Sequence, residues 1–159
     1  MFRLPLKIAA AMTLAATTHL AYADVSADKA AITQRLQRWS DAFNARDARS
    51  VCDLFAPDLV STVPGALNGN RDAVCSRLAR VLARNQPQLR YEKPEIREII
   101  VSGNIAVVRL FWTLTTQAGS RRTVTHEAGM DIFGRQPDGT WSIIRFISFD
   151  FVPHQDNER

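Results

Sequence analysis

The sequence predicts an α+β fold in which three helices precede a curved antiparallel sheet. Between Asp24 and Pro87, apolar residues recur at helical spacing. After Pro87 they alternate with polar residues at every second position, which is typical of strands. Helices that are separated along the chain from strands indicate an α+β fold rather than a parallel α/β fold.

Each of the three helices has an expected capping residue and an apolar face. The first is expected to begin among the acidic residues between Asp24 and Asp28 and to end near Asn44. Asp47 can cap a short second helix, and Asn70 can cap a third. The inward faces are predicted to be Ile32, Leu36, Trp39 and Phe43 in the first helix, Val51, Leu54 and Phe55 in the second, and Val74, Leu78, Val81 and Leu82 in the third.

The strands are separated by turn residues such as Gly, Asn, Pro and Asp. Pro94 lies inside one predicted strand, where it indicates an edge or a bulge because it cannot donate a backbone hydrogen bond. The segment 64–70 reads as a turn-rich loop. The predicted strands are 59–63, 89–101, 105–117, 121–135 and 141–151.

The N-terminus predicts a cleavable secretory signal peptide over residues 1–23. Arg3 and Lys7 provide a positive region, and an alanine-rich apolar run follows them. Ala21 and Ala23 supply the small residues that signal peptidase requires. The alternative is an uncleaved membrane anchor, but the apolar run is short for a hydrocarbon layer of about 30 Å.

Cleavage would leave a single domain over residues 24–153 and a polar tail over residues 154–159, located in the periplasm or secreted. Without the charges of the signal peptide, the formal net charge of +4 falls to about +2. This balance gives no reason to expect nucleic-acid binding. The basic residues Arg77, Arg80 and Arg84 are interpreted as the solvated face of the third helix.

The chain has two cysteines, Cys52 and Cys75, and both follow the predicted signal peptide. Two thiols in an oxidising compartment usually pair, so we expect a structural disulfide. A catalytic cysteine would need a neighbouring base. His126 and His154 have no ligand-like spacing, and neither a metal nor another cofactor is expected.

Four local motifs carry a family resemblance that extends from about residue 32 to residue 151. They are WSDAFNARD at 39–47, LFAPDL at 54–59, GNRDA at 69–73 and MDIFGRQPDGTWSI at 130–143. In this order and spacing they resemble the NTF2-like superfamily, also called the cystatin-like cone. Within it the chain looks most similar to SnoaL-like, DUF4440-type domains. The resemblance implies a pocket between the helices and the concave sheet, frequent homodimers through the sheet, and no single reaction.

Ketosteroid isomerase, the best-understood enzyme of this superfamily, provides three positions for comparison. Its tyrosine falls on Trp39, its base falls on Val63, and its protonated aspartic acid falls on Asp131. Only Asp131 retains the required group. Isomerisation by that mechanism is therefore not expected, although Asp131 remains the candidate catalytic residue.

Strand alternation predicts which side chains face the pocket. In the last strand Trp141, Ile143, Arg145, Ile147 and Phe149 are expected on the outer face, where a dimer partner would cover them. Because the period is two, a shift of one residue would invert these faces. The predicted pocket residues are Trp39, Leu110, Trp112, Leu114, Glu127, Asp131, Ile144, Phe146, Ser148 and Asp150.

Three functions fit these observations. The first is a pocket for a small, mostly apolar molecule that is bound without turnover. The second is an isomerase, cyclase or dehydratase that uses Asp131, with Asp150 or Glu127, as acid or base. In the third, the cavity is filled by side chains and the outer sheet mediates association.

Overall fold

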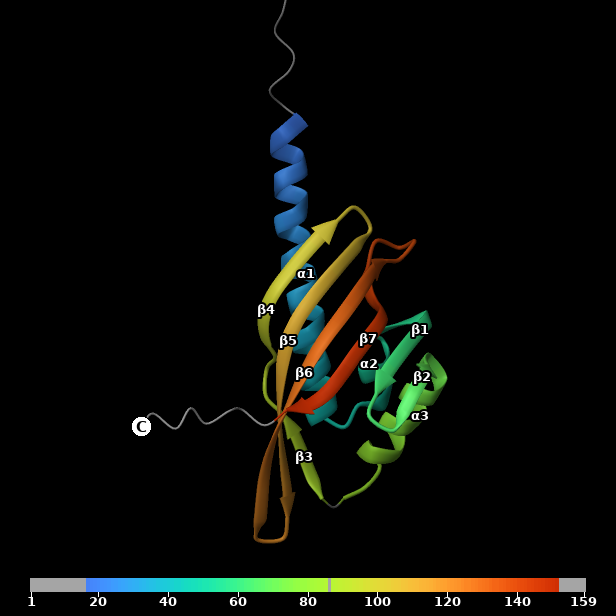
Figure 1. Cartoon of the computed structure of the whole chain (residues 1–159), viewed down its shortest axis with the longest axis vertical. Helices are drawn as coiled ribbons and strands as arrows, with labels where there is room; N and C mark the ends of the chain where they lie inside the picture. The colour runs from blue at the N-terminus through green and yellow to red at the C-terminus, as the bar shows by residue number, and fades with distance from the viewer. Residues whose placement is uncertain (1–16, 86, 152–159) are drawn as a thin grey trace, which may run out of the picture.

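The computed structural model describes residues 17–85 and 87–151, and it has the predicted α+β architecture (Figure 1). Helix α1 crosses one face of a seven-stranded sheet, while α2 and α3 lie near the edge formed by β1 and β2. The elements are α1 (Thr17–Asn44), α2 (Ala48–Cys52), β1 (Phe55–Val63), β2 (Ala66–Asn70), α3 (Arg71–Leu82), β3 (Gln88–Tyr91), β4 (Glu95–Ser102), β5 (Ile105–Ala118), β6 (Arg121–Arg135) and β7 (Trp141–Phe151).

Helix α1 buries the predicted apolar stripe but begins earlier than expected. Ile32, Leu36 and Phe43 are buried, and Trp39 is half-buried. The helix continues back to Thr17 because no proline or glycine interrupts it near Asp24. It thus runs through residues 17–23 of the predicted signal peptide. Residues 1–16 and the predicted tail, including His154, lie outside the described residues.

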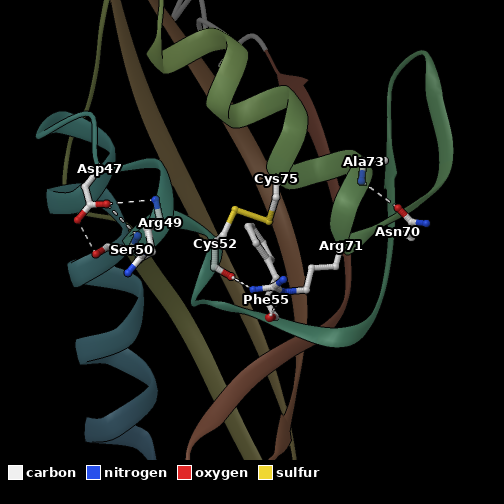
Figure 2. Close-up of a disulfide and its surroundings, with 9 residues drawn as sticks. All are labelled: Asp47, Arg49, Ser50, Cys52, Phe55, Asn70, Arg71, Ala73 and Cys75. Atoms are coloured by element: carbon white, nitrogen blue, oxygen red, sulfur yellow. Dashed lines mark hydrogen bonds between the residues drawn. A yellow bond between two sulfur atoms is a disulfide. The ribbon is translucent and has the colours of Figure 1, made fainter.

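The predicted caps of the next two helices are confirmed (Figure 2). Asp47 Oδ1 accepts backbone hydrogen bonds from Arg49 and Ser50, each at 3.1 Å. Asn70 Oδ1 accepts one from the backbone nitrogen of Ala73 at 2.9 Å. Each cap satisfies amide groups that the first turn of a helix leaves without partners.

The predicted disulfide between Cys52 and Cys75 is present and joins the end of α2 to α3 (Figure 2). The two Cα atoms are 5.7 Å apart. Beside it, Arg71 donates from Nε to the carbonyl of Phe55 at 3.1 Å and from Nη2 to the carbonyl of Cys52 at 3.3 Å. These bonds fix α3 against the start of β1.

The sheet differs from the predicted antiparallel meander in three places. Its order is β2-β1-β7-β6-β5-β3, with β4 also paired to β5, and β1 runs parallel to β7. The segment predicted as a loop forms β2, which pairs with β1. The single strand expected over residues 89–101 is two strands, β3 and β4, separated around Pro94 because proline lacks the amide hydrogen that a continuous ladder needs.

A β-bulge in β7 shifts its alternation by one residue. Ile132 pairs with Arg145, whereas the next residue of β6, Phe133, pairs with Ile143. Ile144 is therefore the extra residue of the bulge. As a result Ile143 turns inward and is buried, which corrects the outward position predicted for it.

Trp141, also predicted on the outer face, is instead buried in contact with α1. Its indole Nε1 donates to Asp28 Oδ1 at 3.0 Å. Arg135 Nη2 lies 2.5 Å from Asp28 Oδ2, and the guanidinium stacks over the Trp141 ring at 4.4 Å. This buried network attaches the first half of α1 to β6 and β7.

We expect Asp28→Ala to lower the free energy of unfolding by about 3 kcal/mol, because it leaves the indole and the guanidinium without their acceptor. Chemical denaturation would measure the change. The matched control is Asp41→Ala on the same helix, whose ion pair with Lys93 is exposed, with an expected effect below about 1 kcal/mol. Equal effects of the two substitutions would show that the Asp28 network does not stabilise the fold.

Candidate functional site

A cavity of about 220 Å³ lies between the helices and the inner face of the sheet. Helices α1 and α3 provide part of its wall, and five strands provide most of the rest. The aromatic side chains among the lining residues come from four strands and one helix. The lining residues are Trp39, Leu54, Phe55, Val63, Val74, Arg77, Leu78, Tyr91, Trp112, Glu127, Gly129, Asp131, Ile143, Phe146 and Ser148.

A second hollow, of about 450 Å³, lies along α1 and α2 and shares Trp39 and Leu54 with the cavity. Its other walls carry charges of both signs, from Arg35 and Arg38 and from three aspartates. The smaller cavity is the better candidate site because it combines apolar walls with a few polar groups, as ligand sites usually do.

Six of the ten predicted pocket residues line the cavity: Trp39, Trp112, Glu127, Asp131, Phe146 and Ser148. They come from one helix and three neighbouring strands. The alternation that placed Glu127 and Asp131 on the same face of β6 therefore has the predicted geometry.

The other four predicted residues do not line the cavity. Leu110 faces inward but is packed in the core, with its Cδ2 only 3.3 Å from where a Cβ on Gly129 would lie. Leu114 pairs with Tyr91 and Thr125, two residues beyond Trp112, the residue of β5 that lines the cavity.

Ile144 and Asp150 were misplaced for different reasons. Ile144 is the bulged residue of β7, and its side chain lies over Gly134 instead of the cavity. Asp150 pairs with Glu127 near the end of the strand, where its side chain is exposed. Its charge still acts on the cavity, because it contributes to the raised pKa of Glu127.

Asp131 is the most deeply buried acid of the cavity. Its side chain is 6% exposed, and burial raises its pKa to about 7. Among the described residues, no group donates a hydrogen bond to its carboxyl. A buried carboxyl without a partner costs free energy in the empty fold and is available to a ligand.

Glu127 forms a second polar group on the same wall. The Tyr91 hydroxyl donates a hydrogen bond to its Oε1 at 2.8 Å. Burial raises the pKa of Glu127, although the tyrosine hydrogen bond opposes this change. Burial and the charge of Glu127 also raise the pKa of Tyr91 well above its usual range, so the phenol stays protonated as the donor.

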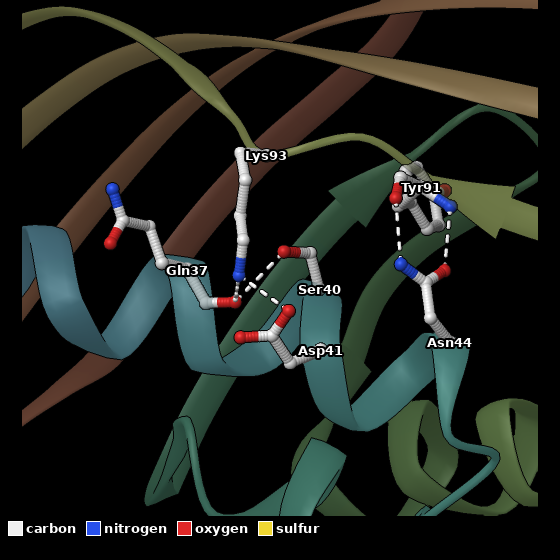
Figure 3. Close-up of polar contacts among 6 residues, drawn as sticks. All are labelled: Gln37, Ser40, Asp41, Asn44, Tyr91 and Lys93. Carbon is white, nitrogen blue, oxygen red and sulfur yellow. Dashed lines mark hydrogen bonds and ion pairs between the residues drawn. The ribbon is translucent and has the colours of Figure 1, made fainter.

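Tyr91 is held in place by Asn44 at the end of α1 (Figure 3). The Asn44 amide donates to the Tyr91 carbonyl at 2.8 Å and accepts from the Tyr91 backbone nitrogen at 2.9 Å. Lys93 pairs with Asp41 at 2.5 Å and donates to the Gln37 carbonyl at 3.1 Å. The segment between β3 and β4 is thus attached to α1 by backbone and side-chain bonds.

Aromatic rings pack around the Tyr91 side chain. Trp39, Phe43 and Trp112 have their ring centroids 4.8–5.6 Å from that of Tyr91. The Trp39 indole Nε1 is enclosed and has no hydrogen-bond acceptor among the described residues. The rings fill part of the space below α1, but they leave the cavity open beside Asp131.

Sequence reasoning missed Tyr91 and Arg77 as cavity residues. Tyr91 lies in a strand too short and too close to Pro94 for its register to be predicted. Arg77 was interpreted as solvated together with Arg80 and Arg84. The latter two are exposed, but Arg77 follows Val74 by three residues and so shares its inward face.

Two further properties bear on the site. Within residues 17–85 and 87–151, no three His, Cys, Asp or Glu side chains gather in a group able to hold a metal ion. None of the described helices combines the length and the apolar character needed to cross a membrane.

The three-helix, curved-sheet architecture with a cavity under the helices defines an NTF2-like, cystatin-like fold. The chain belongs to the SnoaL-like domain family, whose model matches residues 36–144. No curated protein matches it significantly in sequence.

Solved structures share the fold at low sequence identity. A conserved protein from Planctomyces limnophilus has a TM-score of 0.69 and 23% identity, covering 79% of this chain and 98% of its own. An NTF2-like protein with a cystatin-like fold from Novosphingobium aromaticivorans has a TM-score of 0.69 and 18% identity, covering 85% and 89%. A ketosteroid isomerase-like protein from Erwinia carotovora atroseptica has a TM-score of 0.62 and 22% identity, covering 78% and 96%. At these identities the likeness establishes the fold alone.

The titration of Asp131 predicts a pH dependence of stability. The folded state holds the Asp131 proton up to a pH of about 7, whereas an unfolded aspartate releases it near its usual value of 3.8. The contribution of Asp131 to the free energy of unfolding is therefore complete at low pH. It is lost as the pH rises from the unfolded-state pKa to the folded-state pKa, by about 4 kcal/mol at most.

Asp131→Asn should remove this loss, so that the variant gains stability relative to the wild type between pH 4 and pH 8. Chemical denaturation of both proteins across the range would measure the difference, in which the titration of the other groups largely cancels. A constant difference across the range would mean that Asp131 has an ordinary pKa.

Proposed function

We propose that this protein binds a small, mostly apolar molecule that carries a hydroxyl or carbonyl oxygen. The observation that carries the proposal is the Asp131 carboxyl, which is buried in the cavity wall without a hydrogen-bond partner among the described residues. A ligand oxygen at this point would receive or donate the missing hydrogen bond, depending on the protonation of Asp131.

The volume and walls of the cavity limit the ligand. At about 220 Å³ the cavity is smaller than the roughly 300–1,000 Å³ typical of drug-sized sites. Its apolar and aromatic walls favour a hydrocarbon or aromatic body. The ligand is therefore a compact molecule with few polar groups.

Val63 favours binding without turnover. This position corresponds by resemblance to the base of ketosteroid isomerase, and Val63 lies in the cavity wall. Valine cannot accept a proton. The competing function, an isomerase, cyclase or dehydratase, would have to use Asp131 and Glu127, which share the inner face of β6 with Gly129 between them.

We place this binding domain outside the cytoplasm, in the periplasm or in the secreted fraction, after removal of residues 1–23. The Cys52–Cys75 disulfide supports this location, because such bonds persist in oxidising compartments.

A matched pair of probes tests the binding site. We expect 3-phenylpropan-1-ol to bind about fivefold more tightly than propylbenzene, because the hydroxyl gains a hydrogen bond worth roughly 1 kcal/mol. Asp131→Leu should remove this preference, whereas the same substitution at the exposed Asp58 should leave it unchanged. Isothermal titration calorimetry, or the fluorescence of Trp39 and Trp112, would measure the affinities.

Two results would contradict the proposal. Equal affinities of the wild type for alcohol and hydrocarbon would exclude Asp131 as the recognition group. Recovery of a chemically changed molecule from protein isolated from its own host would favour the acid–base enzyme instead.

The exposed outer face of the sheet supports a second proposal, that two copies of the chain associate through it. Apart from Val25 on α1, the large exposed apolar residues of the described chain all belong to this face. Ile147 and Phe149 are each about half exposed at its centre. The whole set on the face is Val60, Ile100, Ile105, Val124, Met130, Ile147 and Phe149. An apolar patch spread over β4, β5, β6, β7 and β1 is typical of an interaction surface.

Ile147→Glu should raise the dissociation constant of this dimer at least tenfold, because the carboxylate would be buried against the partner copy. A change of this size is about the effect of losing one central apolar contact. Sedimentation velocity over a range of protein concentrations would measure the dissociation constant. Val25→Glu, on a helix away from the sheet face, is the control and should have no effect. A wild-type protein that stays monomeric would exclude the dimer.

A further inference from the structure

Arg77 introduces a positive charge into the wall of the cavity. It lies on α3 and lines the cavity together with Val74 and Leu78, which occupy the same face of the helix. Its side chain is half-buried. Among the described residues that line the cavity, Arg77 is the only basic one.

This guanidinium has no acidic partner among the described residues. Three arginines of the described chain form ion pairs: Arg97 with Glu95 at 3.0 Å, Arg109 with Glu98 at 3.6 Å and Arg135 with Asp28 at 2.5 Å. No carboxylate described in the structure lies within ion-pair distance of Arg77, and no described group accepts a hydrogen bond from it.

Neither acid of the cavity forms an ion pair with Arg77. A nearby guanidinium would lower the pKa of a carboxyl. Burial alone raises the pKa of Asp131, and burial with the charge of Asp150 raises that of Glu127. Arg77 is not among the charges that act on either group. The cavity thus has two separate polar regions, with the acids on β6 and the base on α3.

We propose that the ligand is the monoanion of a small apolar acid whose carboxylate pairs with Arg77. The inference rests on the proposed function, because it names the class of molecule that the same cavity binds. The planar guanidinium can donate two parallel hydrogen bonds to a carboxylate. The aromatic rings of Trp112 and Phe146 would surround the apolar body.

A single cation favours a carboxylate over a more highly charged group. A phosphate dianion would need further donors, and the described lining residues offer one cationic group, the guanidinium of Arg77. Because burial raises the pKa of Asp131 to about 7, this carboxyl carries less negative charge near neutral pH and repels an anion less than an ordinary carboxylate would.

The test compares 3-phenylpropanoate with 3-phenylpropan-1-ol, which share the same carbon skeleton. At pH 7 the wild type should bind the acid at least tenfold more tightly than the alcohol, the gain expected of a charge-assisted hydrogen bond. Arg77→Gln should remove this tenfold preference, because it lowers the affinity for the acid and leaves the affinity for the alcohol unchanged. Calorimetric titration would give both affinities.

Arg80→Gln is the matched control, since Arg80 is exposed on the same helix, and it should change neither affinity by more than about twofold. Arg77→Lys should retain part of the preference, because it keeps the charge and loses the planar fork. Circular dichroism would establish that the variants are folded.

The outcomes separate this inference from the proposed function. Binding of the alcohol with equal or weaker binding of the acid would overturn the anion proposal and leave the apolar site in place. An equal loss of both affinities in Arg77→Gln would also overturn it. If neither molecule binds to the wild type, both proposals are wrong.

Discussion

The position of α1 across the inner face of the sheet is fixed by polar contacts at two points of the helix, and the shape of the cavity depends on it. Toward its start, Asp28 binds Trp141 and Arg135 from the sheet. At its end, the Asn44 side chain binds both the backbone nitrogen and the carbonyl oxygen of Tyr91. Between these points Ile32 and Leu36 are fully buried, whereas Trp39 reaches the cavity. The helix can therefore cover the sheet without filling the space below Trp39.

The contact between Asn44 and Tyr91 also affects the acidic side chains of the cavity wall. The Asn44 bonds set the position of Tyr91, whose hydroxyl then orients Glu127. Asp131, four residues along β6, has no such partner in the described part of the chain, and its raised pKa reflects burial alone. Two acids on one strand are thus placed in different environments. This difference is the reason for assigning Glu127 to the structure of the wall and Asp131 to the ligand.

Local signals made much of this structure predictable. Asp47 and Asn70 were recognisable as caps, and the limits of β6 and β7 follow from alternation between turns. The Cys52–Cys75 bond followed from the number of cysteines and the expected compartment. The alternation in β6 also placed Glu127 and Asp131 on one face, where the structure has them.

The remaining features depend on contacts between distant parts of the chain. The bulge at Ile144, which no local pattern reveals, reversed the expected faces of Trp141 and Ile143, and Trp141 then contacts Asp28 on the distant helix α1. The parallel pairing of β1 with β7 joins strands that are far apart in sequence. Arg77 resembled its solvated neighbours because the wall that it faces is supplied by the sheet. A sequence pattern describes one element, whereas a cavity is formed by several.

The geometry of β6 keeps the two proposed surfaces independent although they share a strand. Met130 and Asp131 are neighbours in sequence, but alternation directs Met130 to the exposed outer face and Asp131 to the cavity. A substitution on the outer face leaves the side chains of the cavity wall in place, so association and ligand binding can be altered separately. Changes at the centre of β7 have the same property, because beyond the bulge Phe146 and Ser148 face inward and Ile147 faces outward. A single sheet can therefore support a dimer on one side and a binding site on the other without either function requiring the other.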